Sequence, residues 1–208
     1  MIRKHVGILI YEEVEVLDFC GPFEVFSVTR LREELRRDEP SPFLPLLIAE
    51  DLQPVTATGG MRVLPHHSLT DCPQLDVLVV PGGWGFRHHM QNTALHDWIR
   101  RQADKAETVA AVCTGAMLLS SAGLLDGSRA TTHWRFLDAM HDAFPAVTVV
   151  RDKHFVQDGR MFTSAGISAG IDMSLKLVEQ YFGDTIARAT ARHMEYPYPD
   201  NDTRRIQL

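Results

Sequence analysis

A cysteine lies where the apolar run "TVAAV" meets the small-residue run "TGAM", within residues 108–125. A tight turn between a buried strand and a helix presents its central side chain above the sheet, and such a turn needs small neighbours. The N-terminus of the following helix lowers the pKa of a thiol there and favours the thiolate. Free cysteines are also commonly buried as small apolar side chains. Spacing alone therefore leaves two interpretations of Cys113 open, a nucleophile and a core thiol.

A nucleophilic cysteine works with an acid–base partner, and three side chains elsewhere in the chain are candidates. Asp18 interrupts the apolar stretch "VEVLDFCGPF", and a buried carboxyl has a raised pKa that suits it to hold or pass a proton. Its alternative role is to cap the helix that follows. His133 follows "TT" at a predicted strand end, with a structural histidine as the alternative. Asp172 lies in a helical segment, where a hydrogen bond to a neighbouring loop is the alternative.

Gly82 and Gly83 follow the apolar run "LDVLVVP". Their N–H groups are candidates to hold a developing negative charge, as in an oxyanion hole, although such a sequence is also common in simple turns. Two adjacent histidine pairs occur in the chain, His66-His67 and His88-His89. Neither has an HxxxH or HExxH spacing, and no Walker loop or GxGxxG is present. We therefore expect no metal and no cofactor.

Apolar runs alternate with helical patterns along most of the chain. Buried strands are predicted at residues 5–11, 43–49, 75–80 and 108–112, and helices within residues 12–37, 91–105, 114–125, 133–143, 164–183 and 184–194. In the first helix, Gly21-Pro22 is expected at the start, and Leu31 and Leu35 on the apolar face. Hairpins are predicted at residues 59–60 and 157–159. This alternation predicts an α/β fold with a mostly parallel central sheet.

The predicted strand order along the chain places the chemically interesting residues at strand ends. Asp18 follows the first strand, Gly82-Gly83 the third and Cys113 the fourth. Ligands of open α/β sheets bind beyond the carboxyl ends of the strands. The sequence therefore predicts that these residues meet at one edge of the sheet.

Composition is that of an ordinary soluble protein. The chain has 208 residues, 45% of them hydrophobic, and a formal net charge of −6. We expect one domain over residues 1–208, with a core at about 5–194 and an extended tail at 195–208. The acidic balance argues against a nucleic-acid surface. Three widely spaced cysteines indicate reduced thiols and a cytoplasmic location, and no run reaches the ~18 apolar residues of a membrane span.

Four segments together resemble the DJ-1/PfpI (ThiJ/PfpI) superfamily over residues 5–194. They are "GILIYEEVEVLDFCGPFEVF", "LDVLVVPGG", "VAAVCTGAMLLSSAGLLDGSRATTHW" and "TSAGISAGIDMSLKLVEQYFG". The resemblance implies a flavodoxin-like three-layer sandwich of the class I glutamine-amidotransferase type. It is strongest to the isonitrile hydratase branch and to the amidase-like domains of AraC-type regulators. Peptidases of the superfamily place a histidine directly after the cysteine, so Thr114 at that position argues against a Cys–His peptidase.

The resemblance also implies roles for individual residues. Cys113 resembles the family nucleophile, Asp18 its partner acid, and Thr114 a residue that assists catalysis. The implied substrate- or oxyanion-binding residues are Gly82, Gly83 and His133, together with the Thr114 backbone. The implied activity is a lyase that hydrates an isonitrile to an N-substituted formamide, acting as a homodimer on a small molecule.

Two alternative functions stay open on the same fold. One is a non-enzymatic protein that senses redox state or a small molecule, and the other is a hydrolase or glyoxalase. A regulator of the AraC type carries a further ~100 residues with two helix-turn-helix units. We find no such segment in the sequence and expect no direct contact with nucleic acid and no membrane partner.

Overall fold

A seven-stranded sheet forms the centre of the protein, in a computed structural model that describes residues 2–207. Its strand order is β10-β11-β7-β6-β1-β2-β5, and every neighbouring pair is parallel except β10 with β11. The strands are β1 (Lys4–Leu9), β2 (Phe43–Ala49), β5 (His67–Ser68), β6 (Val77–Val80), β7 (Thr108–Val112), β10 (Phe155–Asp158) and β11 (Met161–Ser164).

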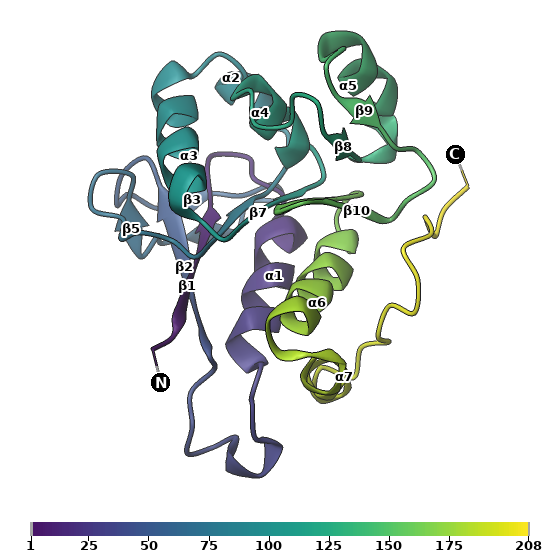
Figure 1. Cartoon of the computed structure of the whole chain (residues 1–208). Helices are drawn as coiled ribbons and strands as arrows, with labels where there is room; N and C mark the ends of the chain where they lie inside the picture. The colour runs from purple at the N-terminus through teal and green to yellow at the C-terminus, as the bar shows by residue number, and fades with distance from the viewer. Residues whose placement is uncertain (1, 208) are drawn as a thin grey trace.

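Helices cover both faces of this sheet and make the fold a three-layer sandwich (Figure 1). On one side lie α1 (Val16–Val28), α6 (Ala169–Phe182) and α7 (Asp184–His193). On the other side lie α2 (Phe86–His89), α3 (Thr93–Lys105), α4 (Gly115–Ser121) and α5 (Leu137–Ala143). The predicted α/β class, with a mostly parallel sheet and a flavodoxin-like arrangement, is confirmed.

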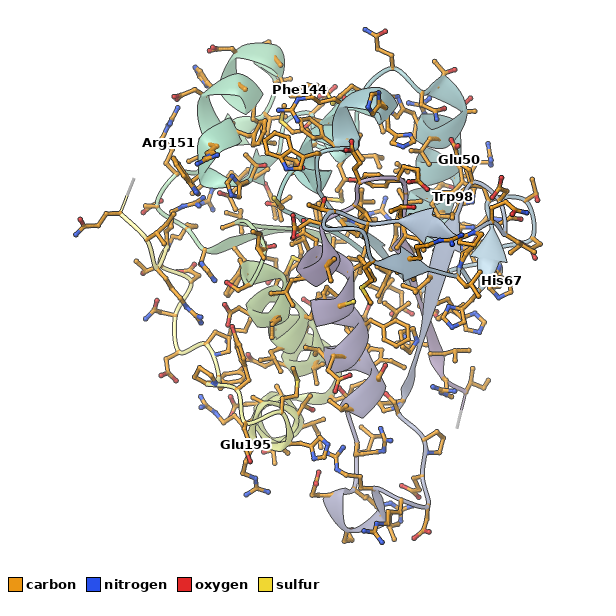
Figure 2. The ribbon with its side chains drawn as sticks, turned by 180° about the vertical axis from the view of Figure 1, so that it is seen from behind. Glu50, His67, Trp98, Phe144, Arg151 and Glu195 are labelled. Carbon is orange, nitrogen blue, oxygen red and sulfur yellow. The ribbon has the colours of Figure 1, made fainter. Side chains whose placement is uncertain are left out.

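The central strands are apolar because they are covered on both faces. Every residue of β6 and β7 is buried, as are the last four of β1. Trp98 of α3 is 2% exposed and lies against the sheet, among the side chains that fill the space between layers in Figure 2. Below the sheet, Phe43 of β2 packs edge-on against Phe26 of α1 and Phe182 of α6. These contacts fix α1 and α6 under the strand ends.

The start of α1 differs from the sequence prediction. The helix begins at Val16, so Asp18 lies in its first turn instead of before it, and Pro22 lies inside the helix instead of at its start. A proline has no N–H to donate to the carbonyl four residues earlier, which here is that of Asp18. The start of the helix is held by the Glu15 N–H, which donates to the Gly82 carbonyl at 2.9 Å.

The end of α1 also comes earlier than predicted, at Val28, so Leu31 and Leu35 lie outside it. Arginine side chains take over the last helical carbonyls. Arg36 Nη1 donates to the Val28 carbonyl at 2.7 Å, and Arg30 Nη1 donates to the Ser27 carbonyl at 2.9 Å. Since these donors replace the next helical turn, the chain leaves the helix and forms the short 3₁₀ helix η1 (Glu33–Leu35).

Smaller elements complete the fold. Both predicted hairpins form, one between β3 (Val55–Thr56) and β4 (Arg62–Val63) and the other between β10 and β11. A separate parallel pair joins β8 (Arg129–Ala130) to β9 (Thr148–Val149). The helix predicted at residues 133–143 begins as a 3₁₀ turn, η2 (Trp134–Phe136), and continues as α5.

Residues 195–207 run along one side of the molecule without forming a helix or a strand (Figure 1). Thr203 makes an isolated bridge with Lys153, and the side chain of Arg204 is buried. Among the described residues, none of the helices is long and apolar enough to cross a membrane.

Candidate active site

Three neighbouring strand ends build the candidate site. In the order β7-β6-β1 the sheet places the segment with Cys113, the Pro81-Gly82-Gly83 turn and the start of α1 side by side. Because these strands are parallel, their carboxyl ends meet at one edge of the sheet. Asp18, Gly82 and Cys113 therefore lie close together, although nearly a hundred residues separate the first from the last.

Cys113 occupies a sharp turn between β7 and α4. Its φ is +57°, a left-handed conformation that residues with a side chain rarely adopt. Gly115 makes the turn possible, because a Cβ there would stand 1.9 Å from the Val80 carbonyl oxygen. The Cys113 N–H donates to the Ser164 carbonyl at 3.2 Å, and the Thr132 hydroxyl donates to the Cys113 carbonyl at 2.8 Å. Two neighbouring segments thus hold the cysteine in this strained conformation.

Asp18 is a fully buried carboxyl without a charged partner among the described residues. The Gly82 N–H donates to its Oδ2 at 2.9 Å, while Oδ1 accepts no hydrogen bond. Burial raises the pKa of Asp18 to about 8, the Gly82 N–H opposes the rise, and the nearby charge of Glu15 adds to it. The carboxyl is therefore protonated at neutral pH. Its side chain does not cap the helix, so the capping interpretation is wrong.

The thiol of Cys113 lies beside Asp18, and the residue is 7% exposed. Burial raises its pKa well above the usual range, and Asp18 raises it further. The N–H groups of Thr114 and Ile167 and the hydroxyl of Thr114 lower it in part. The net shift of the Cys113 pKa is therefore opposite to the predicted one, because loss of solvent at the sulfur outweighs the lowering by the Thr114 N–H at the start of α4. Thiol and carboxyl are both neutral in the resting protein.

Gly82 and Gly83 do not offer the free N–H groups that the sequence suggested. Gly82 donates to Asp18, and the Gly83 N–H donates to Thr114 Oγ1 at 3.1 Å. A Cβ on Gly82 would stand 2.5 Å from the Thr114 nitrogen and 3.0 Å from Asp18 Oδ2. Asp18 and Thr114 therefore occupy the space that a side chain at residue 82 would need. The N–H groups that lower the pKa of the Cys113 thiol are instead those of Thr114 and Ile167.

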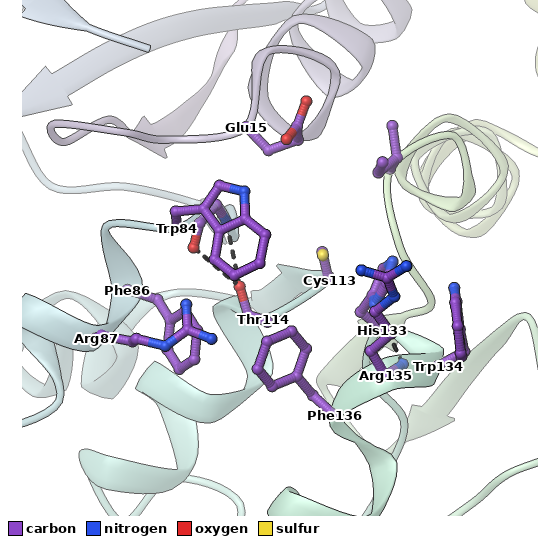
Figure 3. A pocket seen from close by; sticks show the side chains of 12 residues that line it. Glu15, Trp84, Phe86, Arg87, Cys113, Thr114, His133, Trp134, Arg135 and Phe136 are labelled. Atoms are coloured by element: carbon purple, nitrogen blue, oxygen red, sulfur yellow. Dashed lines mark hydrogen bonds between the residues drawn. The ribbon is translucent and has the colours of Figure 1, made fainter. Parts of the chain in front are cut away.

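A pocket of about 280 Å³ opens above Cys113 (Figure 3). It is lined by Glu15, Gly83, Trp84, Phe86, Arg87, Cys113, Thr114, His133, Trp134, Arg135, Phe136 and Ile167. Asp18 and Gly82 are not among the lining residues and lie behind them. Sequence reasoning missed the wall formed by Trp134, Arg135 and Phe136, and it missed Ile167. The last had a signal, because it follows β11, the strand next to β7, and the strand-end rule applies to β11 as well.

His133 lines the pocket but makes no recorded hydrogen bond to Cys113. Its Nδ1 accepts the Arg135 N–H at 3.3 Å at the start of η2. Burial lowers the pKa of His133, with smaller contributions from Arg135 and Arg204. Its ring packs on Gly166, where a Cβ would come within 2.0 Å. His133 is thus a neutral wall of the pocket at pH 7.

Asp172, the third candidate partner, lies elsewhere. Its two carboxylate oxygens bind His154 Nε2 at 2.7 Å and Arg205 Nη2 at 2.8 Å. Asp172 does not line the pocket, so it is not the acid that serves Cys113. Within residues 2–207, no three His, Cys, Asp or Glu side chains gather as ligands of a metal ion.

The fold and the site together define a class of proteins. The sheet is flavodoxin-like, and at the carboxyl ends of its strands a buried thiol lies on a strained strand–helix turn, beside a buried acid. The chain belongs to the DJ-1/PfpI family, whose model matches residues 4–180. It is 38% identical to the isonitrile hydratase of Pseudomonas putida over 201 residues, which cover 95% of this chain and 81% of that enzyme.

Other relatives have different functions. The chain is 36% identical to the transcriptional regulator CdhR of Pseudomonas aeruginosa over 141 residues, which cover 68% of this chain and 41% of the regulator. Among solved structures, a ThiJ/PfpI family protein from Pseudomonas syringae superposes with a TM-score of 0.82 at 28% identity, covering 97% of this chain and 78% of that one. Drosophila melanogaster DJ-1beta superposes with a TM-score of 0.76 at 22% identity, covering 94% and 100%, and it supports the fold alone.

Proposed function

We propose that the protein hydrates an isonitrile to an N-substituted formamide, with Cys113 as nucleophile and Asp18 as the proton carrier. One observation carries the proposal. Cys113, a neutral thiol, lines the pocket, and beside it lies the buried, neutral carboxyl of Asp18 with no hydrogen bond to its Oδ1 from the described residues. Adding a thiol across an isonitrile carbon requires one proton at the carbon and releases one from the sulfur. A protonated carboxyl can supply the first and accept the second.

In the first step, the isonitrile carbon bonds to Cys113 Sγ. The S–H bond breaks, and a C–S and a C–H bond form, giving the thioimidate R–N=CH–S–Cys. Asp18 gives its carboxyl proton to the carbon and receives the thiol proton, so it is protonated before and after. The N–H groups of Thr114 and Ile167 stabilise the charge that develops on the sulfur.

In the second step, water adds to the C=N bond of the thioimidate. The nitrogen gains one proton from the water, and the carbon gains the hydroxyl group. The C–S bond then breaks as the hydroxyl proton returns to the sulfur through Asp18. The products are the formamide R–NH–CHO and the restored thiol, with no oxidant, metal or cofactor required.

The shape of the site also supports an isonitrile over a bulkier electrophile. Only 7% of Cys113 is exposed, and Asp18 is fully buried. The isonitrile group is linear, and its reactive carbon is the terminal atom. Such a group can reach a recessed sulfur while its substituent stays in the wider part of the pocket, whereas the trigonal carbonyl carbon of a peptide carries substituents on both sides.

The direct test is turnover of cyclohexyl isocyanide, followed as N-cyclohexylformamide. We expect turnover by the wild-type protein and a loss of about 10³-fold or more in Cys113→Ala. Cys72→Ala is the matched control, because Cys72 is a half-buried thiol outside the pocket. No formamide at high protein concentration would contradict the activity. Turnover that Cys113→Ala leaves unchanged would contradict the covalent route and leave Asp18 to activate water.

The similarity to transcriptional regulators favours a second candidate, a sensing protein without catalytic activity. Mass spectrometry after mild peroxide treatment separates the two. Selective oxidation of Cys113 over Cys20 and Cys72, in a protein without turnover, would support sensing. A glyoxalase or hydrolase is supported instead by turnover of methylglyoxal without turnover of isonitriles. The homodimer and the cytoplasmic location stay predictions, and sedimentation of the purified protein tests the first.

A further inference from the structure

The pocket walls contain two arginines that the proposed hydration chemistry does not use. Arg87 follows Trp84 and Phe86 at the start of α2, and Arg135 lies between Trp134 and Phe136 in η2. Two separate strand ends thus each contribute a tryptophan, a phenylalanine and an arginine to the same cavity. Figure 3 shows both arginines among the aromatic rings around Cys113.

Each guanidinium lies close to aromatic rings. The Arg87 Cζ lies 4.8, 4.9 and 5.3 Å from the ring centroids of Trp84, Phe86 and Phe136. Arg135 Cζ lies 5.0 Å from the ring of Trp134. A cation–π contact of this kind uses none of the N–H donors of a guanidinium in a conventional hydrogen bond. The donors of both arginines are therefore available to a bound molecule.

Neither guanidinium has a carboxylate or a hydrogen-bond acceptor among residues 2–207, unlike several other arginines of the chain. Those with a carboxylate at short range are Arg32, Arg36, Arg100, Arg151, Arg188 and Arg205. The chain has a net charge of −6 and offers carboxylates in plenty. Two unpaired guanidiniums at one cavity are thus a local positive region on an acidic protein.

The single acidic residue that lines the pocket is Glu15. In Figure 3 it lies at the top of the view, with Arg87 and Arg135 lower and on opposite sides of Cys113. A negative group on a bound molecule is therefore repelled by Glu15 and attracted to the two arginines. This polarity fixes how a substrate with one charged end enters the pocket.

We propose that the natural substrate is an isonitrile whose flat apolar body carries a carboxylate. This assignment rests on the proposed function and adds to it the chemical class of the substrate. The aromatic rings of Trp84, Trp134 and Phe136 receive the body, and the guanidiniums of Arg87 and Arg135 receive the carboxylate. Arginine suits this role because its planar donors match the two oxygens of a carboxylate. The isonitrile at the opposite end then points to Cys113.

The test compares 4-isocyanobenzoate with its methyl ester in wild type, Arg87→Met and Arg135→Met. Methionine keeps apolar bulk in the pocket and removes the charge. We expect wild type to prefer the carboxylate over the ester by about tenfold in kcat/KM, chiefly through KM. The preference falls as NaCl is added, since both arginines are exposed to solvent. In either variant the ratio of the two substrates moves toward one.

Arg101→Met is the matched control. Arg101 is an exposed arginine of α3 outside the pocket and without a carboxylate partner among the described residues. If the proposal is right, Arg101→Met keeps the wild-type ratio of kcat/KM for the carboxylate and the ester. Equal kcat/KM for the two substrates in wild type, or a preference that survives in both pocket variants, overturns the proposal.

Binding of the products separates this proposal from the activity itself. If no isonitrile is turned over, the proposed function fails, and the pocket is tested with 4-formamidobenzoate and methyl 4-formamidobenzoate. Tryptophan fluorescence reports binding, because Trp84 and Trp134 line the cavity. Tighter binding of the carboxylate, weakened in Arg87→Met and Arg135→Met, supports the recognition of a carboxylate. Equal binding of both compounds refutes it.

Discussion

Two buried aspartates in this protein differ in what surrounds them. Asp18 of α1 and Asp172 of α6 are both fully buried, and their helices pack against each other below the sheet. Asp172 has a partner on each oxygen, His154 at 2.7 Å and Arg205 at 2.8 Å. Asp18 has one backbone N–H on Oδ2 and nothing on Oδ1. Asp172 thus has side-chain partners that can compensate a negative charge, whereas Asp18 has none among the described residues.

The difference shows how a fold separates a structural acid from one that can move a proton. A buried carboxylate is tolerated when charged partners and hydrogen bonds replace water, as at Asp172. Without them, the charged form is disfavoured and the proton stays on the group. Burial raises the pKa of Asp18 to about 8. At neutral pH Asp18 is therefore a neutral acid beside a thiol.

Asp18→Asn removes this acid with little change in shape. The amide oxygen can still accept the Gly82 N–H, but the side chain can no longer give or take a proton. We expect turnover of cyclohexyl isocyanide to fall by about 10²- to 10⁴-fold, the usual contribution of a general acid–base group. In wild type the rate also falls above pH about 8, where Asp18 ionises.

Asp172→Asn is the control for this change, because it neutralises the other buried aspartate. Measured on folded protein, it is expected to leave kcat within a few-fold of wild type. An equal loss in both variants would contradict the division of roles between the two aspartates.

The pH dependence of stability distinguishes the same pair. In the unfolded chain Asp18 ionises near its ordinary pKa of about 3.9, while the folded protein keeps the proton up to about pH 8. Stability therefore falls as pH rises through this window and levels off above it. Asp18→Asn has no group that titrates at this position, so it does not lose this stability. Its unfolding free energy relative to that of wild type should therefore rise by up to about 5 kcal/mol between pH 4 and 8.

Asp172→Asn should change stability in the opposite direction. It breaks a buried ion pair and is expected to lose about 2–4 kcal/mol at neutral pH. Urea unfolding at several pH values, followed by circular dichroism, measures both variants. A difference between Asp18→Asn and wild type that does not change with pH would show that Asp18 is ionised in the folded protein.

The sequence predicted the raised pKa of Asp18 and its place at the edge of the sheet, but not its position within the first turn of α1. Apolar runs reveal strand ends, and the rule for parallel sheets brings Asp18, Gly82 and Cys113 to one edge. The partners of Asp172 could not be predicted from the sequence, because His154 and Arg205 come from distant segments with no shared pattern. The direction of the pKa shift of Cys113 could not be predicted from the sequence either. It depends on how completely neighbouring loops remove water from the sulfur, and a local motif carries no such information.

Gly115→Ala tests whether the turn at Cys113 requires the close approach of Gly115 to the backbone of Val80. A Cβ at Gly115 would stand 1.9 Å from a backbone oxygen of Val80, which cannot move without disturbing β6. We expect a loss of about 1–3 kcal/mol in unfolding free energy, as for other overpacked sites, with reduced turnover. Gly21→Ala is the comparison in the interface of α1 and α6, where the nearest atom is 2.9 Å away on the flexible side chain of Ile171. Comparable losses at both glycines would argue against a special constraint at the turn.

The smallest expected effect concerns two consecutive arginines of the C-terminal segment. Arg204 contacts the segment that supports Cys113, and Arg205 contacts Asp172. Arg204 Nη2 donates to Thr131 Oγ1 at 2.8 Å and to the Thr132 carbonyl at 3.2 Å, behind the threonine that holds the Cys113 carbonyl. Arg205 binds Asp172. Arg204 is therefore a positioning residue for Cys113, and Arg205 belongs to the structural ion pair.

Arg204→Met should lower kcat by roughly fivefold to tenfold, about the value of one lost hydrogen bond in the support of the nucleophile. KM should stay near the wild-type value, because Arg204 does not line the pocket. Arg204→Lys, which retains one charged donor, should recover part of kcat. Arg205→Met should lower the melting temperature and leave kcat unchanged on folded protein. Should both methionine variants lose stability alone, with kcat intact, the C-terminal segment supports the fold without positioning Cys113.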